Sequence, residues 1–377
     1  MSLKNVFEVA GSPSDPTHDF TGTFAAILAN GDSVFVPVRR DGASNVIPYI
    51  VKRLSPPSDS VIMCESPLVE IEAGDPTEWI MDLANGVHRL HISGGTWGKN
   101  SCGVLRHQRL IEGSLTTSIF EKMFIDGVGG HLNMGFQIGS CAGVIWRDMA
   151  FRRIDCYGIR FQLDNGYATT NTVDNCRFQD IQGISIYFTH SGDAQLKAGN
   201  RISGCWFENS GIPDPQGAIR TKGFHYGLIV ERCYFEETGS GSFADIHLED
   251  STNLDGKVDT VRSVMIRDNK FSNSKESQEC RVRNVGRVSY VAMDNDVNTL
   301  FSSTLADHQH FASCEGVKAG GRDYKVWLLR NLIHYRGTTN GPLNYHDALY
   351  VIPTSVSNFQ YVEVEPHPAS AGFWLAR

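Results

Sequence analysis

One six-residue pattern recurs along the chain at nearly constant spacing, and it constrains the fold more than any other feature of the sequence. The segments VDNCRF, ISGCWF, VERCYF and IRDNKF each begin with an apolar residue and end with an aromatic one. The last position of each copy continues a longer series, whose steps run from 26 to 36 residues: Trp97, Phe124, Phe151, Phe178, Phe207, Phe235, Phe271, Val297 and Ile333. A repeat of this kind indicates a solenoid in which each copy forms one structural unit.

The local pattern within each repeat favours β-strands over helices. Apolar and polar residues alternate around the hexamers, as in HISGGTW and SVMIRDNKF, and no helical period is sustained there. A second alternating run follows most copies, at 157–164, 182–189, 217–223, 242–250 and 280–284. Short strands and tight turns repeated about every 27 residues predict an all-β chain, a right-handed parallel β-helix of about nine or more coils.

Stacked coils place equivalent side chains in ladders inside the solenoid. The fourth hexamer position holds a run of cysteines and then asparagines: Cys176, Cys205, Cys233, Asn269, Asn295 and Asn331. We expect the cysteines to fill the core and the asparagines to bond the backbone at the turns. The nine cysteines form no CxxC pair, so we predict reduced thiols, no metal site and no cofactor.

Charge and hydropathy exclude several classes of function. The formal net charge is −8 and no basic run occurs, which argues against nucleic acid as a partner. No stretch of 18 apolar residues is present, so we expect no membrane insertion. The first 20 residues lack the apolar core of a secretory signal peptide.

The N-terminal segment 19–38 predicts a helix over 21–30, capped by Asp19 or Thr21 and stopped at Asn30-Gly31, and then a strand at 34–37. This stretch resembles the opening of the pectate-lyase-like superfamily of bacteriophage tailspikes. The matching positions are Asp19, Thr21, Phe24, Ala26, Ile27, Gly31, Val34, Phe35, Val36 and Pro37.

The resemblance implies a phage tailspike: a homotrimer that binds and often cleaves bacterial cell-surface polysaccharide. Such a protein is assembled in the host cytoplasm and located in the virion tail. We therefore expect residues 1–18 to attach to phage tail or baseplate proteins and 19–335 to form the β-helix. Residues 336–377, which contain the apolar run Phe373, Trp374 and Leu375, are expected to form a β-rich C-terminal cap or a trimerisation segment.

No compact catalytic motif occurs, so a site must be assembled across coils. Two longer steps of the repeat carry insertions at 249–260 and 303–324, and insertions in solenoids often lie on a binding face. The alternation in the second runs predicts one inward residue from each coil at equivalent positions, namely Phe161, Ile186, Thr221, Leu248 and Val282. This alignment predicts that titratable groups of five coils share one outer face.

The predicted catalytic residues on that face are Asp245, Glu249 and Asp164, with Asp250 in reserve. The predicted substrate-binding residues are Tyr187, Arg220, Lys222, His247 and Arg283. Glycoside hydrolysis needs two carboxyl groups, and the resemblance favours that reaction. A lyase would instead need a base, such as His247 or Tyr187, and a cation, such as Arg220 or Lys222. Two further alternatives stay open: a glycan-binding protein without turnover, and a solvated face held by ion pairs.

Overall fold

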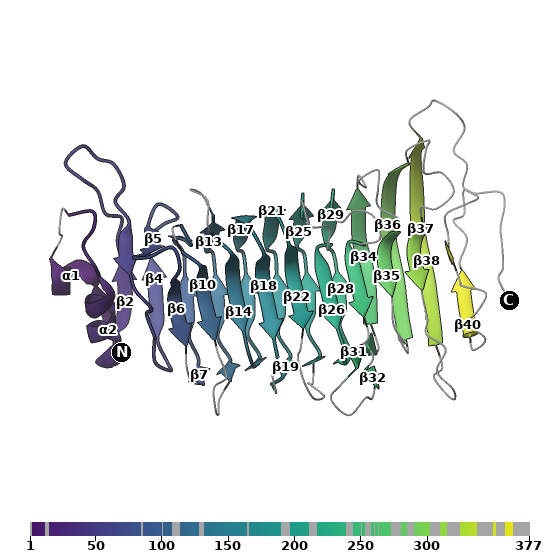
Figure 1. Cartoon of the computed structure of the whole chain (residues 1–377), viewed down its shortest axis with the longest axis horizontal. Helices are drawn as coiled ribbons and strands as arrows, with labels where there is room; N and C mark the ends of the chain where they lie inside the picture. The colour runs from purple at the N-terminus through teal and green to yellow at the C-terminus, as the bar shows by residue number, and fades with distance from the viewer. Residues whose placement is uncertain are drawn as a thin grey trace.

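The computed structural model is an elongated stack of parallel β-strands with two short helices at its N-terminal end (Figure 1). The structure describes residues 2–11, 15–83, 86–99, 101–107, 114–127, 132–163, 166–189, 197–210, 217–238 and 244–249, and beyond residue 249 the strands alone, with side chains for 264–272 and 282. Nearly all strand pairs are parallel, and strands about one repeat apart in sequence are hydrogen-bonded neighbours. The predicted parallel β-helix is therefore confirmed.

A ten-stranded sheet, called here the front sheet, faces the viewer in Figure 1. It consists of β6 (Trp79–Leu83), β10 (Gly103–His107), β14 (Met134–Ile138), β18 (Tyr157–Gln162), β22 (Ile184–Thr189), β26 (Ile219–Lys222), β30 (Ile246–Glu249), β35 (Cys280–Asn284), β37 (His310–Cys314) and β39 (Tyr350–Val351). These strands are the second alternating runs of the sequence and their equivalents in other coils.

The hexamers form a second and larger sheet, called the hexamer sheet, which has two limbs. The first limb comprises β1 (Leu3–Asn5), β2 (Ser33–Val36), β4 (Val61–Cys64), β8 (His91–Ser93), β12 (Ile119–Glu121), β16 (Ile145–Arg147), β20 (Thr172–Asp174), β24 (Arg201–Ser203) and β28 (Ile229–Glu231). The second limb comprises β3 (Tyr49–Val51), β5 (Glu70–Ala73), β9 (Thr96–Trp97), β13 (Phe124–Asp126), β17 (Ala150–Ile154), β21 (Arg177–Ile181), β25 (Trp206–Glu208) and β29 (Tyr234–Glu236). The longer strands β34 (Val264–Ser272), β36 (Tyr290–Phe301), β38 (Lys325–Gly337) and β40 (Phe359–Val364) continue the sheet.

Short strands between the front sheet and the first limb form an edge sheet. They are β7 (Val87–His88), β11 (Leu115–Thr116), β15 (Cys141–Ala142), β19 (Ala168–Thr169), β23 (Lys197–Ala198), β27 (His225–Tyr226) and β33 (Val261–Arg262). A small antiparallel pair, β31 (Ser251–Thr252) and β32 (Val258–Asp259), lies within the predicted insertion 249–260. The insertion at 303–324 lies outside the described residues except for β37.

A single residue in the left-handed conformation turns the chain from the first limb to the second. The positions are Lys122, Asp148, Asn175, Gly204, Arg232 and Asp268, with φ between 50° and 62°. Such a corner reverses the inward and outward sense of the residues that follow it, because it adds one residue to the alternation. The hexamer is therefore a strand, a corner and a strand.

Phenylalanines stack along the inside of the second limb. Phe151, Phe178, Phe207, Phe235 and Phe271 pair in register, with ring centroids 4.6–5.1 Å apart and interplanar angles of 8–12°. All five rings are fully buried. The ladder predicted from the repeat is thus confirmed over these five coils, and it holds the core together by apolar burial between coils.

The predicted register is wrong by one residue at four other positions, which lie in three coils. Ile125, not Phe124, pairs with both Trp97 and Phe151. The repeat also predicts an inward apolar residue five positions before the last residue of each copy, which gives Ile119, Ala292 and Leu328 in three of the coils. In the structure the ladder passes instead through Phe120, Met293 and Leu329. Apolar residues stand at adjacent positions there, so either one satisfies the sequence pattern.

The fourth hexamer position lies in the core, as expected. Cys176, Cys205 and Cys233 are buried, and burial raises the pKa of the Cys176 and Cys233 thiols. The side-chain oxygen of Asn269 accepts from the backbone N–H of Cys233 (2.9 Å), and its amide donates to the carbonyl of Val230 (3.0 Å). Asn269 therefore joins two coils, whereas Asn295 and Asn331 lie in strands whose side chains are outside the described residues.

The N-terminal helices cover one end of the stack (Figure 1). Helix α2 (Thr21–Ala29) confirms the predicted capping helix and buries Phe24, Ile27 and Leu28. Asp19 accepts from the backbone N–H of Thr21 (2.9 Å), and Gly31 follows the helix with a φ of 74°.

Residues 3–10 of the expected attachment segment form β1 and α1 (Val6–Ala10), and β1 pairs with β2. At the other end of the chain, β40 pairs in parallel with β38, and residues 365–377 lie outside the described residues. The boundaries at 18 and 335 and the roles of the two terminal segments stay predictions.

Candidate functional site

The outer face of the front sheet carries a continuous ladder of polar and aromatic side chains. Neighbouring strands contribute one residue each, in register: Asp82, Arg106, Gln137, Arg160, Tyr187, Arg220, His247 and Arg283. Residues on either side of the ladder, such as Ile186 and Phe188, are buried in the core, so the ladder residues face outward. The structure thus brings together Tyr187, Arg220 and His247, and for Arg283 it gives the strand position alone.

Aromatic rings accompany the arginines along this face. The guanidinium carbon of Arg160 lies 4.9 Å from the ring centroid of Tyr157, and that of Arg220 lies 5.6 Å from the centroid of Tyr187. The two tyrosine rings stack at 5.7 Å with an interplanar angle of 26°. Arg106 is placed in the same way over Trp79, at 5.6 Å. Alternating rings and guanidinium groups of this kind offer stacking surfaces and hydrogen-bond donors side by side.

Glu249 is held at the end of β30 by two basic neighbours. Its Oε1 lies 2.6 Å from a terminal nitrogen of Arg220 and 3.2 Å from Nε2 of His247. Lys222 is its register partner on β26. The side chain of Glu249 is 14% exposed, so its carboxylate reaches the surface while its neighbours fix its position. Such a carboxylate is suited to proton transfer or nucleophilic attack on a bound sugar.

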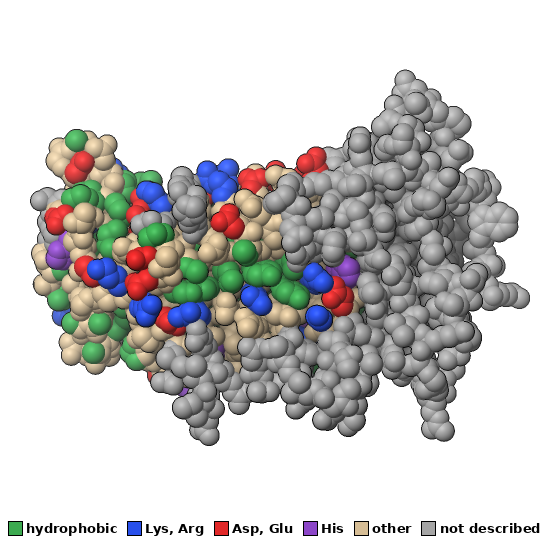
Figure 2. All heavy atoms as spheres, in the orientation of Figure 1, with side chains coloured by type: hydrophobic (Ala, Val, Ile, Leu, Met, Phe, Trp, Pro, Cys, Tyr) green, Lys and Arg blue, Asp and Glu red, His purple; other side chains and the backbone are tan. Residues whose placement is uncertain are grey.

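Figure 2 shows the same face in space-filling form. A band of hydrophobic side chains crosses the described part of the front sheet, with basic side chains along one side of it. Acidic, basic and histidine side chains gather at the end of the band nearest the C-terminal coils. The described front face therefore places apolar surface next to acidic, basic and histidine groups.

Asp245 does not lie on this face, and its expected outward orientation is wrong. Its side chain is fully buried and accepts a hydrogen bond from the hydroxyl of Thr238. Asp245 comes directly before the inward residue Ile246. The equivalent residues in two earlier coils, each also directly before an inward isoleucine, are Ser185 and Gly158. Ser185 is also fully buried, and a Cβ added to Gly158 would meet the ring of Phe178 at 2.9 Å. The chain turns a corner here, so two successive residues point inward and the alternation assumed from sequence fails.

Asp245 and Glu249 therefore lie on opposite sides of the sheet and form no catalytic pair. Asp164 and Asp250 are outside the described residues. The same corner explains why Tyr157 was missed: it has the parity of the inward residues Ile159 and Phe161, yet it stacks on the outer Tyr187. Aligning the equivalent runs of the earlier coils would have added Trp79 and Arg106.

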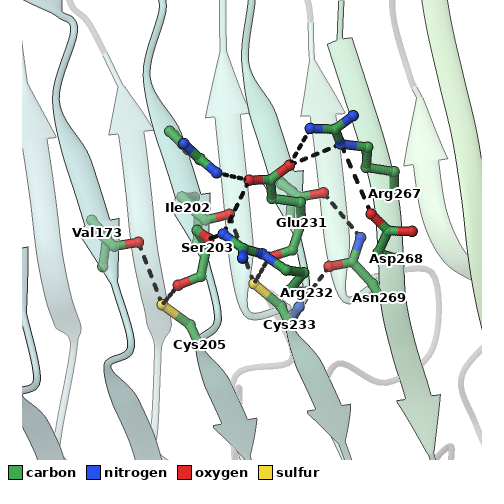
Figure 3. Close-up of polar contacts among 12 residues, drawn as sticks. Val173, Ile202, Ser203, Cys205, Glu231, Arg232, Cys233, Arg267, Asp268 and Asn269 are labelled. Atoms are coloured by element: carbon green, nitrogen blue, oxygen red, sulfur yellow. Dashed lines mark hydrogen bonds and ion pairs between the residues drawn. The ribbon is translucent and has the colours of Figure 1, made fainter.

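The outer face of the first limb carries a different cluster, centred on Glu231 (Figure 3). This carboxylate is 2% exposed, and it pairs with Arg201, with Arg267 (2.7 and 2.8 Å) and more distantly with Arg232 (3.5 Å). Burial opposes its ionisation, but the hydrogen bonds from Arg267 and Arg201 outweigh burial and lower the pKa of Glu231. The cluster ties together β24, β28 and β34, and we interpret it as structural.

In the part of the chain that the structure describes, no group of three or more His, Cys, Asp or Glu side chains is placed to hold a metal ion. Within the same residues, no helix has the length and apolar character needed to cross a membrane.

No family model matches the sequence, and no curated protein is similar to it in sequence. Solved structures do share its fold at low identity. PfbA, a surface adhesin of Streptococcus pneumoniae, is 12% identical with a TM-score of 0.58, over 99% of this chain and 97% of that one. A tailspike mutant of E. coli bacteriophage HK620, in complex with a pentasaccharide, is 11% identical with a TM-score of 0.58, over 96% of this chain and 66% of the tailspike.

An alginate lyase from Paenibacillus sp. str. FPU-7 is 10% identical with a TM-score of 0.50, over 88% of this chain and 95% of the lyase. The chain thus matches an adhesin and a lyase over nearly their whole length, and about two thirds of the tailspike. At these identities the likeness concerns the fold, and the chain has the parallel β-helix fold that tailspikes, adhesins and polysaccharide lyases share.

Proposed function

We propose that the protein binds a bacterial cell-surface polysaccharide along the outer face of the front sheet and depolymerises it. The observation that carries this proposal is the ladder of stacked tyrosines and arginines that ends at Glu249. Tyr157 and Tyr187 stack on sugar rings, while Arg160, Arg220 and Lys222 bind hydroxyl or carboxylate groups.

Hydrolysis is the proposed reaction, with Glu249 as one of its two carboxyl groups. Glu249 lies beside the bound chain as a carboxylate, and it attacks the sugar carbon or takes a proton from the attacking water. The second carboxyl group donates a proton to the glycosidic oxygen as the bond breaks, and Asp164, with Asp250 in reserve, stays the candidate for that role. His247 and Arg220 hold the carboxylate in place through their contacts with Oε1. Asp245 is excluded as the second carboxyl group because it faces the core.

Elimination is the second candidate, and the basic character of the face favours it. Arg220 and Lys222 face outward on β26, and Arg160 faces outward on β18, two strands away, where these cations would neutralise the carboxylate of a uronic acid. His247 or Tyr187 would then remove the proton next to that carboxylate. The fold likeness to an alginate lyase is compatible with this chemistry.

The fold likeness to a tailspike bound to a pentasaccharide supports a place in a phage tail. On this proposal the protein is a homotrimer in the virion tail, assembled in the host cytoplasm. Its first 18 residues attach to tail or baseplate proteins, and its C-terminal segment closes the solenoid or joins the three subunits. An adhesin-like protein that binds glycan without turnover is the non-enzymatic alternative, in keeping with the likeness to PfbA.

Substitution of Glu249 tests the enzymatic proposal. Wild-type protein incubated with purified capsule or lipopolysaccharide from candidate hosts should release oligosaccharides. Products that carry one added water indicate hydrolysis, and unsaturated products without it indicate elimination. Glu249→Gln should reduce product release by at least 100-fold while the protein stays folded.

The matched control is Asp59→Asn, which removes another carboxylate paired with an arginine, Arg89 (2.5 Å), away from the front sheet. This variant should keep full activity. Undiminished product release by Glu249→Gln would remove Glu249 from the catalytic site. Binding by the wild type without any products would leave the adhesin-like alternative.

A further inference from the structure

A second aromatic surface lies on the outer face of the second limb, around the corner of the coil from the front sheet. One outward residue from each of four adjacent strands stands in register there: Arg177, Trp206, Tyr234 and Lys270. The next residues along these strands are the stacked core phenylalanines, so this row points away from the core. Trp206 is 42% exposed, although a large ring of this kind is usually mostly buried.

The rings of Trp206 and Tyr234 pack against each other in one exposed aromatic cluster, called here the platform. Their centroids lie 4.3 Å apart with an interplanar angle of 45°, and the guanidinium carbon of Arg177 lies 5.6 Å from the centroid of Trp206. Because the two residues are register partners in a continuous sheet, the backbone fixes their spacing along the solenoid axis. The platform is therefore preorganised, and little rotamer freedom is lost when a ligand covers it.

A second outward row borders this platform with hydrogen-bonding groups. It lies two residues further along the same strands and consists of Gln179, Glu208, Glu236 and Ser272. Arg177 pairs with Glu208 at 2.8 Å, and the hydroxyl of Tyr234 donates to Glu236 at 3.2 Å. Two carboxylates on adjacent strands thus flank the rings, each oriented by a neighbouring side chain.

We propose that Trp206 and Tyr234, flanked by Glu208 and Glu236, form a second glycan-binding site that takes a pyranose ring of the polysaccharide. A pyranose presents an apolar face of C–H groups, which stacks on aromatic rings, and a rim of hydroxyls, which carboxylates and guanidinium groups bind. The inference rests on the proposed function for the class of ligand. The site anchors the polymer and does not take part in its cleavage.

The chemistry of this face favours a sugar over a second copy of the chain. The centre of a protein interface is depleted in charged residues. Here the two rings are bordered by Arg177, Glu208, Glu236 and Lys270, and the side chain of Arg177 is 52% exposed. A small apolar platform with a charged rim is the size and character of a single sugar, whereas a stable subunit contact needs a much larger apolar area.

Binding of purified capsular polysaccharide and lipopolysaccharide to three variants tests the inference. Trp206→Ala should weaken binding roughly tenfold, and Trp206→Phe, which keeps a ring, should retain most of it. Tyr226→Ala is the matched control, because Tyr226 is a 54% exposed tyrosine on β27 of the edge sheet, and it should bind as the wild type does. Cleavage of saturating short oligosaccharides should be unchanged in all three variants.

The outcomes separate this site from the proposed function. If Trp206→Ala binds the polysaccharide with wild-type affinity, the second site alone is overturned. The same holds if light scattering shows that Trp206→Ala has a different number of subunits from the wild type, since a second copy of the chain would then cover the rings. A different set of results supports the second site and overturns the proposed function. In that case Trp206→Ala loses polysaccharide binding, Tyr187→Ala binds as the wild type does, and the wild type releases no cleavage products. A wild type that binds no polysaccharide overturns both.

Discussion

At the scale of single residues, Glu231 is a buried charge on the outer face of the solenoid that several arginines hold in place. It is nearly inaccessible to water and pairs with arginines from the strands on both sides. Removing its charge leaves Arg201 and Arg267 without their shared partner. We expect Glu231→Gln to lower the free energy of unfolding by about 2 kcal/mol at neutral pH.

The stabilisation by Glu231 depends on pH with a defined sign. Because its pKa is lowered in the folded protein, its contribution is full above the ordinary value of 4.5 and is lost as the pH falls through the folded value. Urea unfolding at a series of pH values from 7 downwards gives the free energy of unfolding of the wild type and of Glu231→Gln. The difference between the two free energies should shrink below about pH 4.5. A difference that stays constant down to pH 3 would contradict the ion-pair account.

Asp245 is a residue whose role the sequence misassigns. Simple alternation from Leu248 places it outside, whereas the corner before β30 turns it into the core beside Thr238. We expect Asp245→Asn to lower the thermal unfolding temperature by several degrees and to leave turnover per folded molecule unchanged. Loss of turnover at unchanged stability would return Asp245 to the catalytic site.

At the scale of elements, the stack of phenylalanines in the second limb links successive coils. The ring of Phe207 lies 5.1 Å from Phe178 and 4.9 Å from Phe235, and it is fully buried. Phe207→Ala removes both contacts and leaves a cavity, so it should cost about 3–5 kcal/mol in the free energy of unfolding. Denaturant unfolding measures this loss.

The control is Phe124→Ala, which truncates a partly exposed ring off the ladder and should cost clearly less. Equal losses would contradict the ladder.

The same elements show how far sequence predicts this structure. Spacing and alternation are enough for the fold class, the capping helix and the inward phenylalanines, because each strand must bury one face against its neighbours. Corners limit the prediction, since one extra residue at a turn changes which side chains face outward. This is why Tyr187, Arg220 and His247 were placed on one face correctly, while Asp245 and Tyr157 were not.

At the scale of the whole molecule, the solenoid converts distance along the chain into proximity on a surface. Residues from Trp79 to Glu249 reach one outer face because each coil advances the chain by a single strand spacing of about 4.8 Å. A polymer of sugars that lies along the axis meets equivalent positions at a regular interval. On the proposed function, the elongated shape in Figure 1 matches a long, repetitive ligand.

The most direct test of this account is the structure of the Glu249→Gln variant bound to an oligosaccharide released by the wild type. We predict sugar rings on the outer face of the front sheet, stacked over Tyr157 and Tyr187, with a glycosidic bond beside residue 249 and hydrogen bonds from Arg220. An oligosaccharide bound elsewhere on the molecule, with this face empty, would contradict the account.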